Sequence, residues 1–467
     1  MTIQQLYTPC LSEAAYYIES NGEAAIIDPL RDIDSYLDLA KKNNAVIKYI
    51  FETHFHADFV SGHIDLSKAT GAPIVYGPGA NTNFEVHNAI DGEIFKLGNI
   101  SLEVVHTPGH TLESTCYLLK DETGKAHAIF TGDTLFVGDV GRPDLSSGDL
   151  SSEDLASIMY DTIQNKIMPL ADDVILYPAH GPGSSCGKNL GPNTVSTIGK
   201  EKETNYALQI QTKEEFIKAI ITGLNAPPVY FAINAQINQQ GYEAIEKILR
   251  KGTKPLTLAE FKEKIKEDVI LLDTRHATQF SDGFVPGAIF IGLEGRFAEW
   301  AGSLLPFDKP ILLITGPGQE KETVTRLSRV GFQKMEGFLS GGFETWKTAG
   351  EKIDLIVNIE ADELMMDIPF DNNLTVVDVR REAEFANGHI EDAMNLPLGD
   401  MIDVAQLAQF EEHQNLYVHC AGGYRSVIAS SLLKRQGVHN LRNVIGGWDK
   451  IKEQDKIKIV KEPAVLN

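Results

Sequence analysis

The 467-residue sequence is poor in cysteine and has no long apolar stretch, and both shortages restrict what the chain can be. Four cysteines are too few for a disulfide framework and fit a reducing compartment. No apolar run reaches the roughly 18 residues that a transmembrane helix needs. The first residues lack a basic segment followed by an apolar one, so we expect no signal peptide and a cytoplasmic protein.

The sequence also has fewer basic than acidic residues. Lys and Arg total 42 against 65 Asp and Glu, which gives a formal net charge of −23. A surface this acidic repels phosphate backbones and anionic lipid, so we expect neither nucleic acid nor membrane as a partner. The apolar content of 43% is ordinary for a globular protein, and the length predicts about three domains.

Residues 1–250 contain short apolar runs that predict β-strands, separated by loops and a few helices. Asn21 and Gly22 stand between two such runs and predict a hairpin, because both residue types tolerate positive φ. Chemically active side chains closely follow several of the predicted strands. Such residues can converge at one edge of a sheet, where loops build sites, and here they are His54, His110, Asp133 and His180.

A linker is predicted at Lys251–Pro255, and an internal repeat follows it. Asp273 recurs as Asp378, and Gly341-Gly342-Phe343 recurs as Gly446-Gly447-Trp448, always 105 residues later. We predict two α/β domains with parallel sheets, a first copy at 257–352 and a second copy at 358–460. The first copy has Thr315 and Glu320 where the second has Cys420 and Arg425, so we expect it to be catalytically inactive.

The segment Thr53–Asp58 places two imidazoles and a carboxylate within five residues, a pattern suited to binding a first-row metal. The residue types alone leave several ligand sets open. They are drawn from His54, His56, Asp58, His110, Asp133 and His180.

Four motifs, at 53–58, 107–111, 131–134 and 177–180, resemble those of the metallo-β-lactamase superfamily in order. The resemblance implies an αββα sandwich over residues 1–250. Phe59 stands where the hydrolytic members, such as glyoxalase II, have a histidine ligand of a second metal. The chain resembles the persulfide dioxygenases, which implies one ferrous iron per chain held by His54, His110 and Asp133. The same resemblance makes His56, Asp58 and His180 hydrogen-bond partners of the site, while spacing alone leaves zinc open.

Cys420 lies between a predicted strand and a predicted helix, in a loop that contains Gly422 and Gly423. Backbone N–H groups and the helix dipole at such a junction lower a thiol pKa. Only four residues separate Cys420 from Arg425, a smaller loop than that of the cysteine phosphatases. The second copy resembles the rhodanese sulfurtransferases, which implies a persulfide on Cys420 and an anionic donor held by Arg425. Its loop predicts substrate contacts from Gly422, Gly423, Tyr424 and Ser426.

Two residues near the metal motifs have open roles. Arg142 either binds a substrate carboxylate or pairs structurally with Asp144. Cys186 follows His180 in a glycine-rich loop, and it is either a substrate-contacting thiol or a plain loop thiol.

The sequence therefore predicts an α/β protein that oxidises a thiol persulfide to sulfite with dioxygen at iron. The rhodanese cysteine would interconvert persulfide, sulfite and thiosulfate. Relatives of both domain types self-associate, so the resemblance also implies a homo-oligomer. Two alternatives stay open: a zinc thioesterase of the glyoxalase II type with a sulfurtransferase, and a non-enzymatic sulfur carrier or sensor. The thiol carrier is not defined by the sequence, and the middle domain has no assigned role.

Overall fold

The computed structural model describes residues 1–145, 150–407, 409–411 and 413–462. The chain divides into two compact units. Unit 1 comprises Met1–Ile245 with Ser328–Gly331, and unit 2 comprises Glu246–Leu327 with Phe332–Asn467.

Unit 1 is built on two six-stranded sheets. The first sheet has its strands in chain order: β1 (Thr2–Thr8), β2 (Glu13–Ser20), β3 (Glu23–Ile27), β4 (Val46–Phe51), β5 (Ile74–Tyr76) and β6 (His87–Asn88). The second also runs in chain order: β7 (Ile94–Leu97), β8 (Ile100–His106), β9 (Thr115–Lys120), β10 (Ala126–Gly132), β11 (Ile175–Pro178) and β12 (Ser196–Thr197). Buried side chains of both sheets form one apolar cluster, which is expected when two sheets pack face to face.

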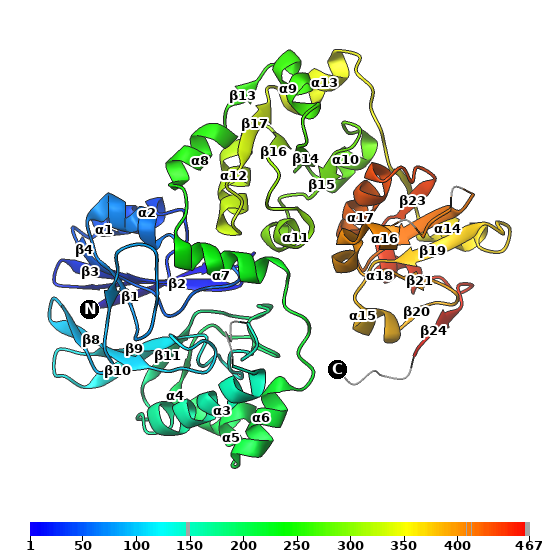
Figure 1. The fold of residues 1–467 in the computed structure, drawn as a ribbon. Helices are drawn as coiled ribbons and strands as arrows, with labels where there is room; N and C mark the ends of the chain where they lie inside the picture. Colours follow the sequence, from blue (N-terminus) through cyan, green and yellow to red (C-terminus); the bar gives the residue numbers. More distant parts are fainter. Residues whose placement is uncertain (146–149, 408, 412, 463–467) are drawn as a thin grey trace. The chain divides into compact units, whose positions relative to one another are not determined.

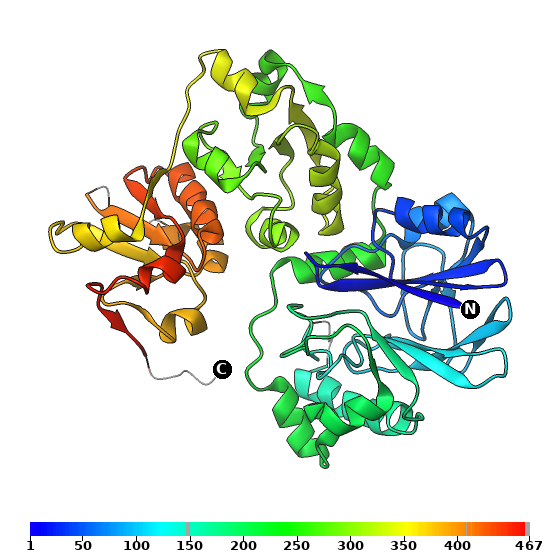
Figure 2. The same ribbon diagram turned by 180° about the vertical axis from the view of Figure 1, so that it is seen from behind.

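Helices cover the outer faces of the two sheets (Figures 1 and 2). The first sheet carries α1 (Asp34–Lys42) and α2 (His63–Thr70). The second carries α3 (Ser152–Thr162), the π-helical turn Ile163–Ile167, α4 (Ile198–Thr204), α5 (Tyr206–Gln209) and α6 (Lys213–Ile221). This is the αββα sandwich predicted from the sequence. The predicted hairpin is also present, with φ of 51° at Asn21 and 79° at Gly22.

Two further helices, α7 (Tyr230–Gln240) and α8 (Ile245–Gly252), follow the sandwich. The predicted linker at Lys251–Pro255 is therefore wrong in part. Lys251 and Gly252 end α8, and Pro255 begins β13 (Pro255–Leu256). Ile245 and Ile248 of α8 are buried, so apolar contacts stabilise a helix where the local Gly and Pro content predicts a break.

Each copy of the repeat contains one five-stranded sheet whose recorded strand pairs are all parallel. The first sheet has the order β13-β17-β16-β14-β15, with β14 (Ile270–Asp273), β15 (Ile289–Phe290), β16 (Ile311–Ile314) and β17 (Met335–Leu339). The second has the order β18-β23-β22-β19-β21, with β18 (Val357–Ile359), β19 (Leu374–Asp378), β21 (Met394–Asn395), β22 (Asn415–His419) and β23 (Leu441–Val444). A short antiparallel pair joins β20 (His389–Ile390) to β24 (Ile459–Val460). The identical order of the two sheets confirms the α/β class and the repeat.

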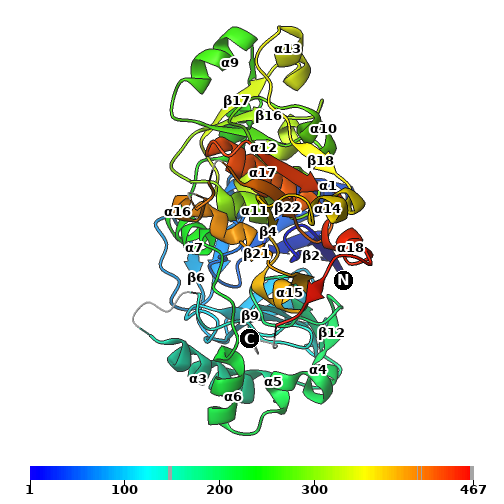
Figure 3. The same cartoon turned by 90° about the vertical axis from the view of Figure 1, so that its right-hand side faces the viewer.

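Helices flank both parallel sheets. The first copy has α9 (Leu258–Ile265), α10 (Ala277–Asp282), α11 (Phe297–Leu304), α12 (Glu320–Arg329) and α13 (Gly342–Thr348). The second has α14 (Ala361–Asp367), α15 (Glu382–Ala386), the 3-10 turn Leu398–Ile402, α16 (Val404–Leu407), α17 (Tyr424–Arg435) and α18 (Gly447–Ile451). Helix α17 packs on β22 and β23 of its own sheet and also contacts β15 of the first copy. Figure 3 shows α17 in the same region of the view as β22.

A buried ion pair recurs in both copies at the 105-residue spacing. Arg275 pairs with Asp273, and Arg380 pairs with Asp378. Each guanidinium lies over the aromatic ring that follows the Gly-Gly pair, 4.2 Å above Phe343 in one copy and 4.3 Å above Trp448 in the other. The recurring sequence positions therefore specify one recurring packing arrangement.

Among the residues that the structure describes, no helix has both the length and the apolar character needed to span a bilayer.

Candidate functional site

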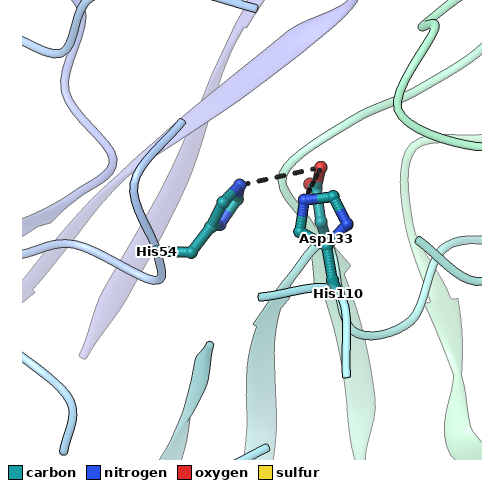
Figure 4. A group of neighbouring side chains, drawn as sticks. All are labelled: His54, His110 and Asp133. Carbon is teal, nitrogen blue, oxygen red and sulfur yellow. Dashed lines mark ion pairs between the residues drawn. The ribbon is translucent and has the colours of Figure 1, made fainter. Parts of the chain in front are cut away.

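Three potential metal ligands from unit 1 come together at the ends of strands (Figure 4). His54 follows β4, His110 follows β8, and Asp133 directly follows β10. The Nε2 atoms of His54 and His110 lie 3.7 and 3.5 Å from Oδ2 of Asp133. All three residues are at most 2% exposed. The ligand set that the sequence resemblance implies is thus one spatial group.

The remaining ring nitrogens of the two histidines are held by hydrogen bonds. Nδ1 of His110 lies 2.7 Å from the backbone carbonyl of Arg142, which can only accept, so this nitrogen is the donor. Thr53 donates its hydroxyl to Asp28 at 2.9 Å and therefore accepts from Nδ1 of His54, also at 2.9 Å. Both rings consequently carry the proton on Nδ1 and direct the Nε2 lone pair toward Asp133.

Electrostatics keep this group in a form that binds a cation. Burial, followed by the neighbouring His56, lowers the pKa of His54 well below its ordinary value, so the ring is neutral at pH 7. Burial alone would raise the pKa of Asp133, but His180 and His54 outweigh burial and lower it, so the carboxylate is ionised. Oδ2 of Asp133 is buried and has no hydrogen-bond partner among the described residues. A buried anionic oxygen without a partner is a strong position for a metal ion.

His56 lies beside this group without belonging to it, with its ring centroid 4.2 Å from that of His54. Its Nε2 lies 3.0 Å from Oδ1 of Asp28 and 3.6 Å from Oε2 of Glu52. Its ring packs on Phe59 with centroids 4.3 Å apart, and Phe59 is fully buried. Neither ring nitrogen of His56 has a hydrogen-bond partner among the described residues, and Asp28, Glu52 and His56 form a second group that could hold a metal ion. The interpretation of His56 as a hydrogen-bond partner of the site therefore stays a prediction.

His180 lies between two carboxylates. Its Nδ1 and Nε2 are each 2.8 Å from an oxygen, of Asp133 and of Asp58 respectively. Burial would lower the pKa of His180, but these two carboxylates outweigh it and raise the pKa well above the ordinary value. Since its two nitrogens contact Asp133 and Asp58, His180 orients the Asp133 carboxylate.

Arg142 is fully engaged in the structure. Its guanidinium pairs with Asp144 at 2.6 and 2.8 Å and donates to the carbonyls of Ser185 and Asn225. Arg142 is only 4% exposed. These contacts favour the structural alternative, in which Arg142 fixes the loop whose carbonyl holds His110.

Cys186 lies beside the metal group, as its position after His180 suggests. Its sulfur groups with Asp58 and His180, and the residue is 1% exposed. Burial, with Asp58 and Asp133 nearby, raises the pKa of Cys186 well above the ordinary thiol value. The thiol is therefore protonated in the resting protein, so any reaction with substrate needs a proton acceptor.

Cys420 follows β22 at the mouth of a loop that leads into α17. Its sulfur accepts the N–H of Gly423 at 3.1 Å and lies 3.6 Å from the hydroxyl of Ser426. Gly423 has a φ of +104° and caps α17, so the loop directs N–H groups at the sulfur. A Cβ at Gly447 would come within 2.3 Å of the Cys420 carbonyl oxygen, which explains the glycine directly before Trp448.

The other loop residues have defined partners. Arg425 forms a two-point ion pair with Glu384 at 2.7 and 2.8 Å, and this pairing raises the pKa of Arg425 and contributes to a lowered pKa of Glu384. The hydroxyl of Tyr424 donates to the carbonyl of Gly292 in the first copy at 2.7 Å. Ser426 is buried, whereas Gly422 borders the cavity above Cys420.

Sequence reasoning missed Asp28, Glu52 and His63, which surround His56. Asp28 directly follows β3, so the rule that singled out the other strand-end residues would also have found it. Glu52 and His63 carry no comparable local signal.

Comparison with known proteins agrees with this geometry. The family model of the metallo-beta-lactamase superfamily matches residues 8–180, and that of the rhodanese-like domain matches 257–349 and 360–454. A probable hydroxyacylglutathione hydrolase of Schizosaccharomyces pombe is 32% identical over 233 residues, 45% of this chain and 85% of the relative. The mitochondrial persulfide dioxygenase of Homo sapiens is 29% identical over 242 residues, 50% of this chain and 87% of the relative.

Among solved structures, a metallo-beta-lactamase from Staphylococcus aureus is 34% identical with a TM-score of 0.64. The match covers 73% of this chain and 98% of that one. The chain therefore belongs to the metallo-beta-lactamase superfamily, and its superfamily domain is followed by two rhodanese-like domains.

Proposed function

We propose that the chain is a persulfide dioxygenase and sulfurtransferase with two separate centres. Unit 1 oxidises a low-molecular-weight thiol persulfide to sulfite with dioxygen, and Cys420 transfers sulfane sulfur between persulfide, sulfite and thiosulfate. The observation that carries the proposal is the buried group of His54, His110 and Asp133, whose two Nε2 lone pairs face an oxygen without a partner. Its two histidines and one carboxylate are the ligand set of non-haem ferrous oxygenases.

The ligand group fits one Fe(II) per chain. Two neutral imidazoles and one carboxylate leave open positions on the ion. When bound, ferrous iron supplies the one-electron chemistry that lets dioxygen react with sulfur. The buried ring of Phe59 packs against His56, at the position where the resemblance to hydrolytic members would require a histidine ligand of a second ion.

The surrounding residues hold the group in place. The carbonyl of Arg142 and the hydroxyl of Thr53 fix the two imidazoles, while His180 orients Asp133 through Oδ1. Cys186 groups with Asp58 and His180, and His180 contacts Asp133, so the thiol lies near this group. Its protonated thiol would donate a hydrogen bond to a persulfide anion before any covalent exchange.

Sulfur transfer is assigned to the second copy. The Cys420 thiolate attacks the outer sulfur of R–S–SH, which gives R–SH and the persulfide Cys420–S–S⁻. Sulfite then takes that sulfur, so thiosulfate leaves and the thiolate returns. The N–H of Gly423 stabilises the anionic sulfur, and Arg425 would hold an anionic donor in exchange for its contact with Glu384.

Oxygen uptake by ferrous-loaded protein given glutathione persulfide tests the first centre, with sulfite and thiosulfate quantified afterwards. Rapid uptake with matching oxidised sulfur is the expected result. No uptake by protein with bound iron, repeated with coenzyme A persulfide, would overturn the proposal.

A zinc thioesterase is the second candidate, since a relative named as a probable hydroxyacylglutathione hydrolase is 32% identical. Hydrolysis of a glutathione thioester by zinc-loaded protein, without oxygen uptake by the ferrous form, would favour it.

A further inference from the structure

The cavity above Cys420 is shared between the two copies. It has a volume of about 530 Å³. The second copy supplies Cys420, Gly422, Tyr424 and Arg425 from the loop, with Arg381 and Glu384 from the start of α15, and the first copy supplies Glu294, Gly295, Arg296 and Trp300. The copy that lacks a reactive cysteine thus forms one wall of the cavity of the copy that has it.

Defined contacts hold this wall in place within unit 2. Tyr424 donates to the carbonyl of Gly292, directly before the wall, and the N–H of Phe290 donates to Ser431 of α17 at 3.0 Å. Arg326 of α12 donates to the carbonyl of Leu293 at 2.6 Å. Hydrogen bonds from both copies therefore hold the segment 292–296.

The second copy does not contribute in the same way to the cavity of the first copy. The first copy has a cavity of similar volume, about 550 Å³, around its own Thr315 loop, and every lining residue comes from that same copy. The 105-residue offset pairs Trp300 with Ala405 and Arg296 with Met401, so the second copy lacks equivalents of both wall residues. The aromatic ring and the guanidinium are specific to the wall that faces Cys420.

The wall suits an organic donor better than a small inorganic one. The volume lies in the roughly 300–1,000 Å³ range of sites for drug-sized ligands, and thiosulfate would fill only a small part of it. Trp300 is partly exposed, and within the described part of the chain its side chain has no hydrogen bond or ring contact. Its indole face can therefore pack against a ligand.

The cavity is lined by three guanidinium groups, of Arg296, Arg381 and Arg425, and by the carboxylates of Glu294 and Glu384. Glu299 of α11 pairs with Arg296 of its own copy and lies 3.9 Å from Arg381 of the second copy. Glu299 is largely buried, whereas the side chain of Arg381 is 59% exposed. Arg296 and Arg381 therefore both line the cavity, whereas Glu299, which lies near both, is not among its lining residues.

We infer that Trp300 and Arg296 of the first copy select the sulfur donor of Cys420, which is a persulfide of a peptide-sized thiol that bears a carboxylate. This inference rests on the proposed sulfur transfer at Cys420. In the bound donor the outer sulfur faces Cys420, the organic group packs on Trp300, and the carboxylate meets Arg296 and Arg381. Thiosulfate reaches the sulfur without these contacts.

Steady-state kinetics of the full-length protein with two different sulfur donors test the inference. Steady-state transfer to sulfite is measured with glutathione persulfide, and transfer to cyanide with thiosulfate, for wild type, Trp300→Ala and Arg296→Ala. We expect KM for the persulfide to rise about tenfold or more with kcat largely kept, and the persulfide-to-thiosulfate ratio of kcat/KM to fall accordingly. Phe370→Ala removes an aromatic ring that is 87% exposed outside the cavity, and should leave the ratio unchanged. An equal effect of the wall variants on both donors, or none, would overturn the selection role.

A binding measurement distinguishes failure of the donor-selection inference from failure of the proposed sulfur transfer. S-methylglutathione is titrated into Cys420→Ser protein with and without Trp300→Ala, by calorimetry. Binding that weakens with Trp300→Ala supports the wall even if wild type transfers sulfur from neither donor, a result that would refute only the proposed transfer. Binding that is absent, or equal in both proteins, overturns the inference.

Discussion

The N–H of Gly423 donates to the sulfur of Cys420 at 3.1 Å, which stabilises negative charge on that atom. The equivalent N–H in the first copy belongs to Gly318, and it donates at 3.3 Å to the carboxylate of Glu320. The hydroxyl of Thr315 donates to the same carboxylate oxygen at 3.3 Å. The first copy has therefore lost its thiol and also fills its anion-binding loop with its own side chain.

Restoring only the thiol should not restore activity. In a Cys420→Ser background, Thr315→Cys is expected to leave thiosulfate:cyanide transfer at background, because Glu320 occupies the N–H group and repels an anionic donor. The variant that combines Thr315→Cys with Glu320→Arg removes that carboxylate and is compared with the variant that carries Thr315→Cys without the Glu320 change. Robust transfer by the Thr315→Cys protein without the Glu320 change would contradict this account.

The two centres should be separable by one substitution. Cys420→Ser is expected to lower thiosulfate-dependent transfer about 1,000-fold or more, because the nucleophile is lost. Sulfite formation with oxygen uptake should continue, because the ligand group lies in unit 1. Cys10→Ser, at a partly exposed position, is the matched control. Simultaneous loss of both activities would show that the centres are not independent.

Local sequence patterns predicted that His54, His110, Asp133 and His180 lie near one another, because each follows a strand that its own apolar residues define. The same patterns could not show that Thr53 and the Arg142 carbonyl fix the imidazole protons. The direction of the Thr53–His54 contact depends on Asp28, 25 positions before Thr53, and the His110 contact joins residues 32 positions apart.

Side-chain partners were the least predictable feature. The rhodanese resemblance assigned Arg425 to an anionic donor, but in the structure this residue pairs with Glu384, 41 positions away. The sequence also could not predict the wall that contains Arg296 and Trp300, because this wall depends on how the two copies pack. Periodicity identifies elements and their faces, whereas packing between elements decides which side chains meet.

Metal content should distinguish ligands from their supports. Asp133→Asn is expected to reduce bound iron to near none, since it removes the ionised oxygen between the two imidazoles. Asp58→Asn should weaken iron binding by about 10–100-fold, because it acts through His180. His56→Gln should keep iron near one per chain, since this ring faces Asp28. Inductively coupled plasma analysis after dialysis measures all three, with circular dichroism to check folding. Iron loss in His56→Gln equal to that in Asp133→Asn would refute the assigned ligand set.

We also expect the free energy of unfolding of unit 1 to fall at low pH, because His63 is buried. This ring is fully buried and stacks on Phe84, and burial is the main cause that lowers its pKa to about 3. The unfolded chain binds a proton at an ordinary histidine pKa near 6.5, so between about pH 6.5 and 3 the unfolded state holds one more proton. The free energy of unfolding therefore falls as pH falls across that window, by at most about 1.4 kcal/mol per pH unit from this group.

Replacing His63 removes that contribution. His63→Gln is expected to be less stable than wild type at pH 7 but to show a shallower loss between pH 6 and 4. The three tryptophans, at 300, 346 and 448, all lie in unit 2, so their fluorescence does not report on unit 1. Hydrogen exchange of peptides from β4 and α2, measured across this pH range, does report on it. His127→Gln, at a partly exposed position of β10, is the matched substitution. A wild-type slope retained in His63→Gln would assign the acid sensitivity to other buried groups.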